Sequence, residues 1–230
     1  MVKEITDMNI SIYEDMQYLV RYPKAYREGD KCPVILFLHG AGTRGDDINR
    51  LVGNPFFKLI AKHDDFPFVV VAPLCHSETW FDHFQTLKRF VTMIAEREFA
   101  DPDRIYLMGA SMGGYATWQL AISMPKAFAA AVPICGGGMY WDAGRLKNLP
   151  IWAFHGDIDP TVLTEESVKM VEAVNRKGGN AKLTVYPDTK HDSWTATYQN
   201  PEVFAWLLSH TRHQEANATD NGYADAKKFG

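Results

Sequence analysis

Hydrophobic residues in this chain gather into short runs that alternate with longer stretches of mixed polarity. The runs are continuous rather than alternating, and they occupy residues 33–38, 68–72, 105–108, 129–134, 151–154 and 183–186. A continuous apolar run of this length is typical of a strand that helices cover on both faces, as in a parallel sheet. A weaker alternation within residues 10–22, ended by Pro23, predicts an opening pair of strands.

Between the apolar runs the spacing predicts helices, at residues 55–63, 83–99, 115–124, 164–177 and 201–210. Strand and helix therefore alternate along most of the chain. This order predicts an α/β fold, with a mostly parallel central sheet, helices on both faces and right-handed crossovers. No linker divides the chain, so we expect a single domain over residues 1–213. Large aliphatic side chains are missing from residues 214–230, which we expect to form a polar C-terminal extension.

The composition excludes several classes of partner. A chain of 230 residues with 46% hydrophobic and 23% charged residues is typical of one soluble globular domain. A net charge of −4 argues against nucleic acid as a partner, because phosphate binding requires a basic face. No apolar run is long enough to span a membrane. Three scattered cysteines, Cys32, Cys75 and Cys135, predict reduced thiols and a cytoplasmic location. The oligomeric state stays open.

The most informative stretch is residues 109–113, Gly-Ala-Ser-Met-Gly, which lies between a predicted strand and a predicted helix. Gly-x-Ser-x-Gly in this context is the nucleophile elbow, a sharp turn that exposes the serine hydroxyl above the sheet. Gly109 and Gly113 stand where a Cβ would collide with neighbouring backbone. The motif predicts Ser111 as a nucleophile.

A glycine-rich loop, His-Gly-Ala-Gly at residues 39–42, follows the first long apolar run. Ligands of such sheets bind at the carboxyl ends of the strands, so this loop is expected to face the same site. The backbone N–H groups of Ala41 and Met112 are predicted to form an oxyanion hole, which stabilises the negative oxygen of a tetrahedral intermediate.

A serine nucleophile needs a base, which is usually a histidine oriented by a carboxylate. Of the eight histidines, His191 has the fitting position, in the loop after the last predicted strand. His39 and His155 each precede a glycine directly after a strand, and we expect them to brace those loops.

The carboxylate is expected in the loop after the preceding strand, where Asp157 and Asp159 compete. Asp157 stands one residue past a glycine, where a carboxylate often caps its own turn. Asp159 lies further out and has the longer reach, so it is the preferred acid. The order Ser111, Asp159, His191 is the chain order of the α/β-hydrolase triad.

Taken together, the segments at residues 39–42, 109–114, 155–162 and 190–194 resemble those of small α/β-hydrolases without a cap domain. The chain is similar to the phospholipase/carboxylesterase group, which includes acyl-protein thioesterases, and to esterase-D-like and polyhydroxybutyrate-depolymerase-like esterases. The resemblance covers residues 15–212. In the thioesterase-like members the acid is the second aspartate of His-Gly-Asp-x-Asp-Pro, which here is Asp159.

These features predict a serine carboxylesterase that acts through an acyl-enzyme on short-chain or aromatic acyl esters, small or linked to carbohydrate. No cofactor is expected, and no metal-ligand spacing such as His-Glu-x-x-His is present. The interval of residues 135–150 is too short for a folded cap, so an open cleft is expected. Trp80 and Trp194 are candidates for its walls.

Three other functions fit parts of the pattern. An acyl-protein thioesterase or lysophospholipase would use the same array of residues. So would a serine peptidase like the catalytic domain of prolyl oligopeptidase, which normally carries an additional propeller domain. A non-catalytic binding protein on the same scaffold would usually have lost the serine or the histidine, and both are present.

Overall fold

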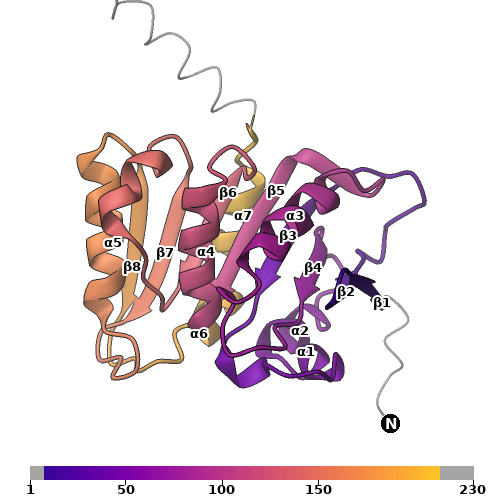
Figure 1. Ribbon diagram of the computed structural model, residues 1–230, viewed down its shortest axis with the longest axis horizontal. Coiled ribbons are helices and arrows are strands. Elements are labelled where there is room, and N and C mark those ends of the chain that lie inside the picture. The colour runs from indigo at the N-terminus through magenta and orange to yellow at the C-terminus, as the bar shows by residue number, and fades with distance from the viewer. Residues whose placement is uncertain (1–7, 213–230) are drawn as a thin grey trace, which may run out of the picture.

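The computed structural model describes residues 8–212 and contains one twisted sheet of eight strands (Figure 1). The strands run in the spatial order β1-β2-β4-β3-β5-β6-β7-β8. Their bounds are Met8–Tyr13 (β1), Met16–Arg21 (β2), Cys32–Leu38 (β3), Val69–Pro73 (β4), Ala100–Ala110 (β5), Ala130–Ile134 (β6), Ile151–Gly156 (β7) and Ala181–Tyr186 (β8).

The first two strands pair antiparallel, and β2 also pairs antiparallel with β4. The other neighbours, from β4 through β3 to β8, are all parallel. The predicted mostly parallel α/β sheet is confirmed. All carboxyl ends of the parallel strands therefore meet at one edge, the lower edge in Figure 1.

Helices cover both faces of the sheet. Their bounds are Asn49–Val52 (α1), Pro55–Ile60 (α2), Phe84–Ala95 (α3), Met112–Ser123 (α4), Thr164–Arg176 (α5), Trp194–Gln199 (α6) and Pro201–Leu208 (α7), with 3-10 turns at Ala41–Thr43 (η1) and Tyr140–Leu146 (η2). In Figure 1, α3, α4 and α5 lie in front of the sheet and α7 lies behind it.

The core consists of two clusters, one on each face of the sheet. Alternate residues of β3 enter different clusters: Leu36 belongs to the cluster that includes Leu87 of α3 and Trp118 of α4, whereas Phe37 stacks on Phe56 of α2 in the other. Because successive strand residues point to opposite faces, a continuous apolar run is what a strand with two covered faces requires.

The structure differs from the predicted elements mainly at their ends. The strand β5 begins at Ala100, before the apolar run at 105–108. The helix α4 begins at Met112, directly after Ser111, rather than at 115. The short elements α1, α6 and η2 carry too few residues to show a periodic pattern. The interval 135–150 holds only η2, so no cap is inserted there. The predicted extension 214–230 lies outside the described residues.

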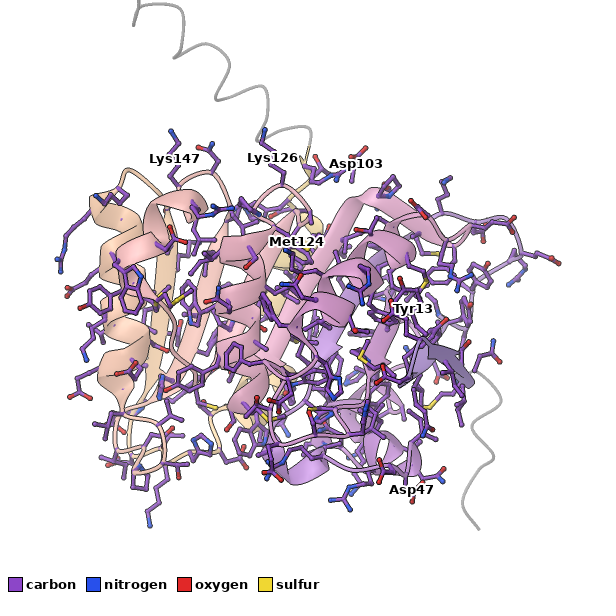
Figure 2. The ribbon with its side chains drawn as sticks, in the orientation of Figure 1. Tyr13, Asp47, Asp103, Met124, Lys126 and Lys147 are labelled. Atoms are coloured by element: carbon purple, nitrogen blue, oxygen red, sulfur yellow. The ribbon has the colours of Figure 1, made fainter. Side chains whose placement is uncertain are left out.

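Figure 2 shows Asp47, next to α1, at the edge of the molecule opposite Asp103, Lys126 and Lys147. Asp47 follows β3 and therefore marks the carboxyl edge, whereas the other three mark the amino edge. None of the helices in residues 8–212 has the length and hydrophobicity needed to cross a bilayer. The three cysteines are free thiols. The cellular compartment stays a prediction.

Candidate active site

Ser111 lies in a strained turn at the carboxyl end of β5. Its backbone has φ 58° and ψ −118°, a conformation that costs a residue with a Cβ about 1–3 kcal/mol. A Cβ built at Gly109 would lie 2.4 Å from the carbonyl oxygen of Gly113, and one built at Gly113 would lie 1.9 Å from that of Leu38. The glycines therefore allow β3, β5 and α4 to approach closely enough to form the turn.

Ser111, His191 and Asp159 form a continuous series of hydrogen bonds, which we call the Ser-His-Asp array. The Oγ of Ser111 lies 2.8 Å from Nε2 of His191. The Nδ1 of His191 lies 2.7 Å from Oδ2 of Asp159. Because a carboxylate only accepts, Nδ1–H donates to Asp159 and Nε2 is left to accept from the serine hydroxyl. This tautomer is the one that a general base requires.

Asp159 is buried, with 4% of its surface exposed. Burial opposes its ionisation, but the hydrogen bond from His191 and those from the N–H groups of Val162 and Thr161 outweigh it, so the pKa of Asp159 lies below its ordinary value. Its Oδ1 accepts from Thr161 N at 2.8 Å and from Val162 N at 3.0 Å. Asp159 therefore stays ionised and keeps one orientation.

The competing aspartate has another role. Asp157 Oδ1 accepts from the N–H of Thr189 at 3.1 Å, so it ties the loop after β7 to the loop after β8. The expectation that Asp157 caps its own turn is wrong, because its carboxylate reaches the loop after β8; Asp159 is the aspartate that accepts from N–H groups of its own turn. Asp157 thus helps to hold the loop that carries His191.

His155 is a second histidine in contact with the acid. It is fully buried, and its Nε2 lies 2.9 Å from the carbonyl oxygen of Val162 and 3.3 Å from Oδ2 of Asp159. Both neighbours are acceptors, so Nε2 carries a proton. Its Nδ1 lies 2.7 Å from Oγ of Ser167, which also contacts the carbonyl oxygen of Gly136 at 3.0 Å. His155 Nε2–H thus donates to the carbonyl oxygen of Val162, whose own N–H donates to Oδ1 of Asp159, so the expectation that His155 braces its loop is confirmed.

We expect His155→Leu to lower kcat by roughly tenfold with little change in KM, because it leaves the carbonyl oxygen of Val162, in the loop of Asp159, without its donor, which costs about 1–3 kcal/mol. His155→Gln, whose amide can donate in a similar direction, should recover part of the activity. An unchanged kcat in the leucine variant would limit His155 to a packing role.

His39 supports the glycine-rich loop from inside the core. It is fully buried, its Nε2 accepts from the N–H of Cys75 at 3.0 Å, and its Nδ1 lies 2.8 Å from the carbonyl oxygen of Gly40. Burial lowers the pKa of His39 to about 4, so the ring is neutral at physiological pH. The expectation that His39 braces its loop is confirmed.

This buried ring predicts acid sensitivity. The pKa of His39 is about 4 in the folded chain, against an ordinary value near 6.5, so protons bind preferentially to the unfolded chain. Stability is therefore full above pH 6.5 and falls as the pH drops toward 4, by about 3 kcal/mol. Urea unfolding at pH 7, 5 and 4 measures this loss. A His39→Gln variant, less stable at neutral pH, should lose less between pH 7 and 4; equal losses would contradict the assignment.

The two tryptophan candidates lie in different places. Trp80 is fully buried, its Nε1 donates to the carbonyl oxygen of His39 at 3.0 Å, and it is not among the residues that line the cavity. The expected place of Trp80 in a cleft wall is therefore wrong, because its loop turns inward beneath the sheet edge. Trp194 does line the cavity, with its ring edge-on to His191 at 5.3 Å between centroids.

A cavity of about 650 Å³ opens over Ser111 and His191. Ala41 lies on its wall beside Ser111, and Met112 follows Ser111 as the first residue of α4. The lining also includes residues that were not predicted from the sequence: Thr43, Arg50, Gly53, Asn54, Pro55, Thr161 and Tyr198. Of these residues only Asn54 and Pro55 are recognisable in the sequence, because an Asn-Pro pair is typical of a helix N-terminus.

The sheet order and the helices on both faces define an α/β-hydrolase fold. The chain belongs to the dienelactone hydrolase family, whose profile matches residues 76–229, about two-thirds of its length. The resemblance to small α/β-hydrolases is thereby confirmed at the level of the fold and of a hydrolase.

Individual proteins similar to this chain include esterases and a peptidase. A thermostable esterase of known crystal structure is 30% identical, with a TM-score of 0.78 over 90% of this chain and 64% of that chain. Dipeptidyl-peptidase 5 of Porphyromonas gingivalis is 23% identical over 233 residues, which cover 79% of this chain and 33% of the relative. Feruloyl esterase B of Piromyces equi is 35% identical over 109 residues, which cover 44% of this chain and 19% of the relative. The chain thus spans a third or less of these two curated relatives.

Proposed function

We propose that this protein is a serine carboxylesterase that cleaves short-chain or aromatic acyl esters through an acyl-enzyme. The observation that carries the proposal is the unbroken series of hydrogen bonds from Ser111 through His191 to the buried Asp159, at 2.8 and 2.7 Å. Nucleophile, base and orienting acid are thus within reach of one another, and the nucleophile and the base open onto one cavity.

In the proposed reaction Ser111 Oγ attacks the ester carbonyl carbon while Nε2 of His191 takes its proton. Asp159 stabilises the imidazolium that forms. The N–H groups of Ala41 and Met112 donate hydrogen bonds to the oxyanion. Ala41 is the first residue of η1 and Met112 the first residue of α4, and an N–H at this position has no acceptor within its own helix. His191 then protonates the departing alcohol, and a water molecule activated by His191 releases the acid and restores the serine.

The cavity walls support the substrate class. Trp194, Tyr198 and Pro55 supply flat apolar surface near Ser111, which suits an aromatic or short aliphatic acyl group. The absence of a cap between β6 and β7 leaves room for a bulky alcohol, such as a sugar, to remain outside. The similarity to feruloyl esterase B favours an aromatic acyl group.

A serine peptidase is the second candidate, and the similarity to dipeptidyl-peptidase 5 over 79% of the chain favours it. The same array would serve, because acyl transfer from an amide also passes through a tetrahedral oxyanion.

A labelling experiment followed by a substrate panel tests the proposal. A fluorophosphonate probe should modify Ser111, and its absence from that residue in a peptide map would favour a non-catalytic protein. The panel contains p-nitrophenyl acetate, butyrate and octanoate, methyl ferulate, an acyl thioester and a prolyl-peptide nitroanilide. Preference for acetate or ferulate supports the esterase. Preference for the peptide would favour a serine peptidase, and preference for the thioester would favour a thioesterase, in place of the esterase.

A further inference from the structure

Three side chains outside the active site converge at the end of the sheet where β2 meets β4. Asp15 lies in the turn between β1 and β2, His76 follows β4, and His83 directly precedes α3. Tyr13, the last residue of β1, marks this region in Figure 2. Each of the three residues offers one potential ligand atom, and these atoms all lie within 4.8 Å of one another.

The separation of Asp15 and His76 suits two ligands of one ion. Oδ2 of Asp15 lies 3.5 Å from Nε2 of His76, which is too long for a charge-assisted hydrogen bond of about 2.7–2.9 Å. Two ligand atoms that each lie about 2.1 Å from a tetrahedral zinc ion are roughly 3.4 Å apart. The pair therefore already has the spacing that an ion between the two groups would require.

His83 supplies an independent observation. Its Nε2 is shielded from solvent and has no hydrogen-bond partner within residues 8–212. Its ring lies beside that of His76, with centroids 4.1 Å apart and planes inclined by 45°. A buried polar atom without a partner is costly, and an ion or a coordinated water would satisfy it.

The neighbouring acids are already engaged. Both carboxylate oxygens of Glu14 accept from Arg89. Asp82 accepts from the N–H and the hydroxyl of Thr79. The donor set is therefore two imidazoles and one carboxylate, which suits zinc and its first-row neighbours rather than calcium or magnesium, which prefer oxygen.

We propose that Asp15, His76 and His83 form a binding site for a divalent zinc-type cation, with water in the remaining coordination position. The inference is independent of the proposed esterase activity.

Such an ion would cross-link the loop after β4, which supports the active site. Within that loop Cys75 N–H and Trp80 Nε1 both donate to His39, at 3.0 Å each. His76 and His83 flank the segment that carries Trp80, and Asp15 belongs to the hairpin beside it. A shared ion would join both ends of this segment to the hairpin and so stabilise the support beneath the loop of Ala41.

The test must separate this site from the active site, because Cys135, Asp159 and His191 form a second group of potential ligands within 4.8 Å. All measurements therefore use a His191→Ala background. Zinc binding is measured by calorimetry, coordination by the visible absorption of Co²⁺, and stability by the thermal midpoint with and without zinc. Asp15→Asn and His76→Ala remove ligands at an exposed and a partly exposed position, and His63→Ala, which removes an exposed histidine outside the cluster, is the matched control.

We expect one zinc per chain, the intense absorption of low-symmetry Co²⁺, and a higher thermal midpoint in the background and in the control. Asp15→Asn and His76→Ala should each weaken zinc binding by about tenfold to a hundredfold or more. Mutating a residue that only hydrogen-bonds to a metal ligand already lowers metal affinity by about that factor. Thermal midpoints without zinc that match the background show that both variants are folded. Failure of the background to bind zinc, or unchanged affinity in both variants, would overturn the proposal.

Discussion

Ser111→Ala is expected to lower turnover of p-nitrophenyl acetate by about 10⁶-fold, the scale seen when the serine of such an array is removed. The reason is that no other hydroxyl is held 2.8 Å from Nε2 of His191 among the hydrogen bonds of the described residues. Ser123→Ala, at the last residue of the same helix α4, is the control and should keep wild-type turnover. Residual activity above about 1% in the Ser111 variant would show that another group carries the reaction.

Asp159→Asn is expected to lower kcat by about 10⁴-fold while leaving the fold intact. An asparagine that turns its NH₂ group toward Nδ1 forces His191 into the wrong tautomer, with the proton on Nε2, where it cannot accept from Ser111. The Oδ1 contacts with Thr161 and Val162 could persist through the amide oxygen, so the loop should keep its shape.

Asp157→Asn is the matched control for this variant, because it makes the same chemical change two residues away. Asp157 contacts the N–H of Thr189 and not His191. Its amide variant should keep kcat within about tenfold, since the amide oxygen can still accept from the N–H of Thr189 and a typical hydrogen bond contributes only about 1 kcal/mol. A larger loss in Asp157→Asn than in Asp159→Asn would reverse the assignment of the acid.

The parts of the structure that were predicted correctly depend on local pattern. An apolar run such as residues 33–38 shows a doubly covered strand without reference to the rest of the chain, and parallel pairing then places every following loop at one edge. Ser111, Asp159 and His191 lie in the loops that follow β5, β7 and β8. Their meeting at hydrogen-bond distance is a consequence of the strand order β5-β6-β7-β8.

The parts that were missed depend on the paths of loops. Trp80 lies only seven residues after β4, yet its loop folds back so that the indole contacts His39 and leaves the cavity. Tyr198 reaches the cavity because α6 packs against α2, a contact between segments far apart in the chain. Similarly, the length of β5 depends on Cys32 pairing with Ala100, and nothing in the polar residues 101–104 indicates a strand.

At Ser111 the requirements of stability and of the proposed catalysis conflict. With φ 58° and ψ −118°, this backbone conformation would be less strained in glycine, which has no Cβ to clash. Relieving the strain would stabilise the chain by about 1–3 kcal/mol, a sizeable share of the 5–15 kcal/mol that typically separates folded from unfolded proteins. The most stable version of this fold is therefore one that has lost its proposed nucleophile, and any search for thermostable variants that ignores activity will tend to select against Ser111.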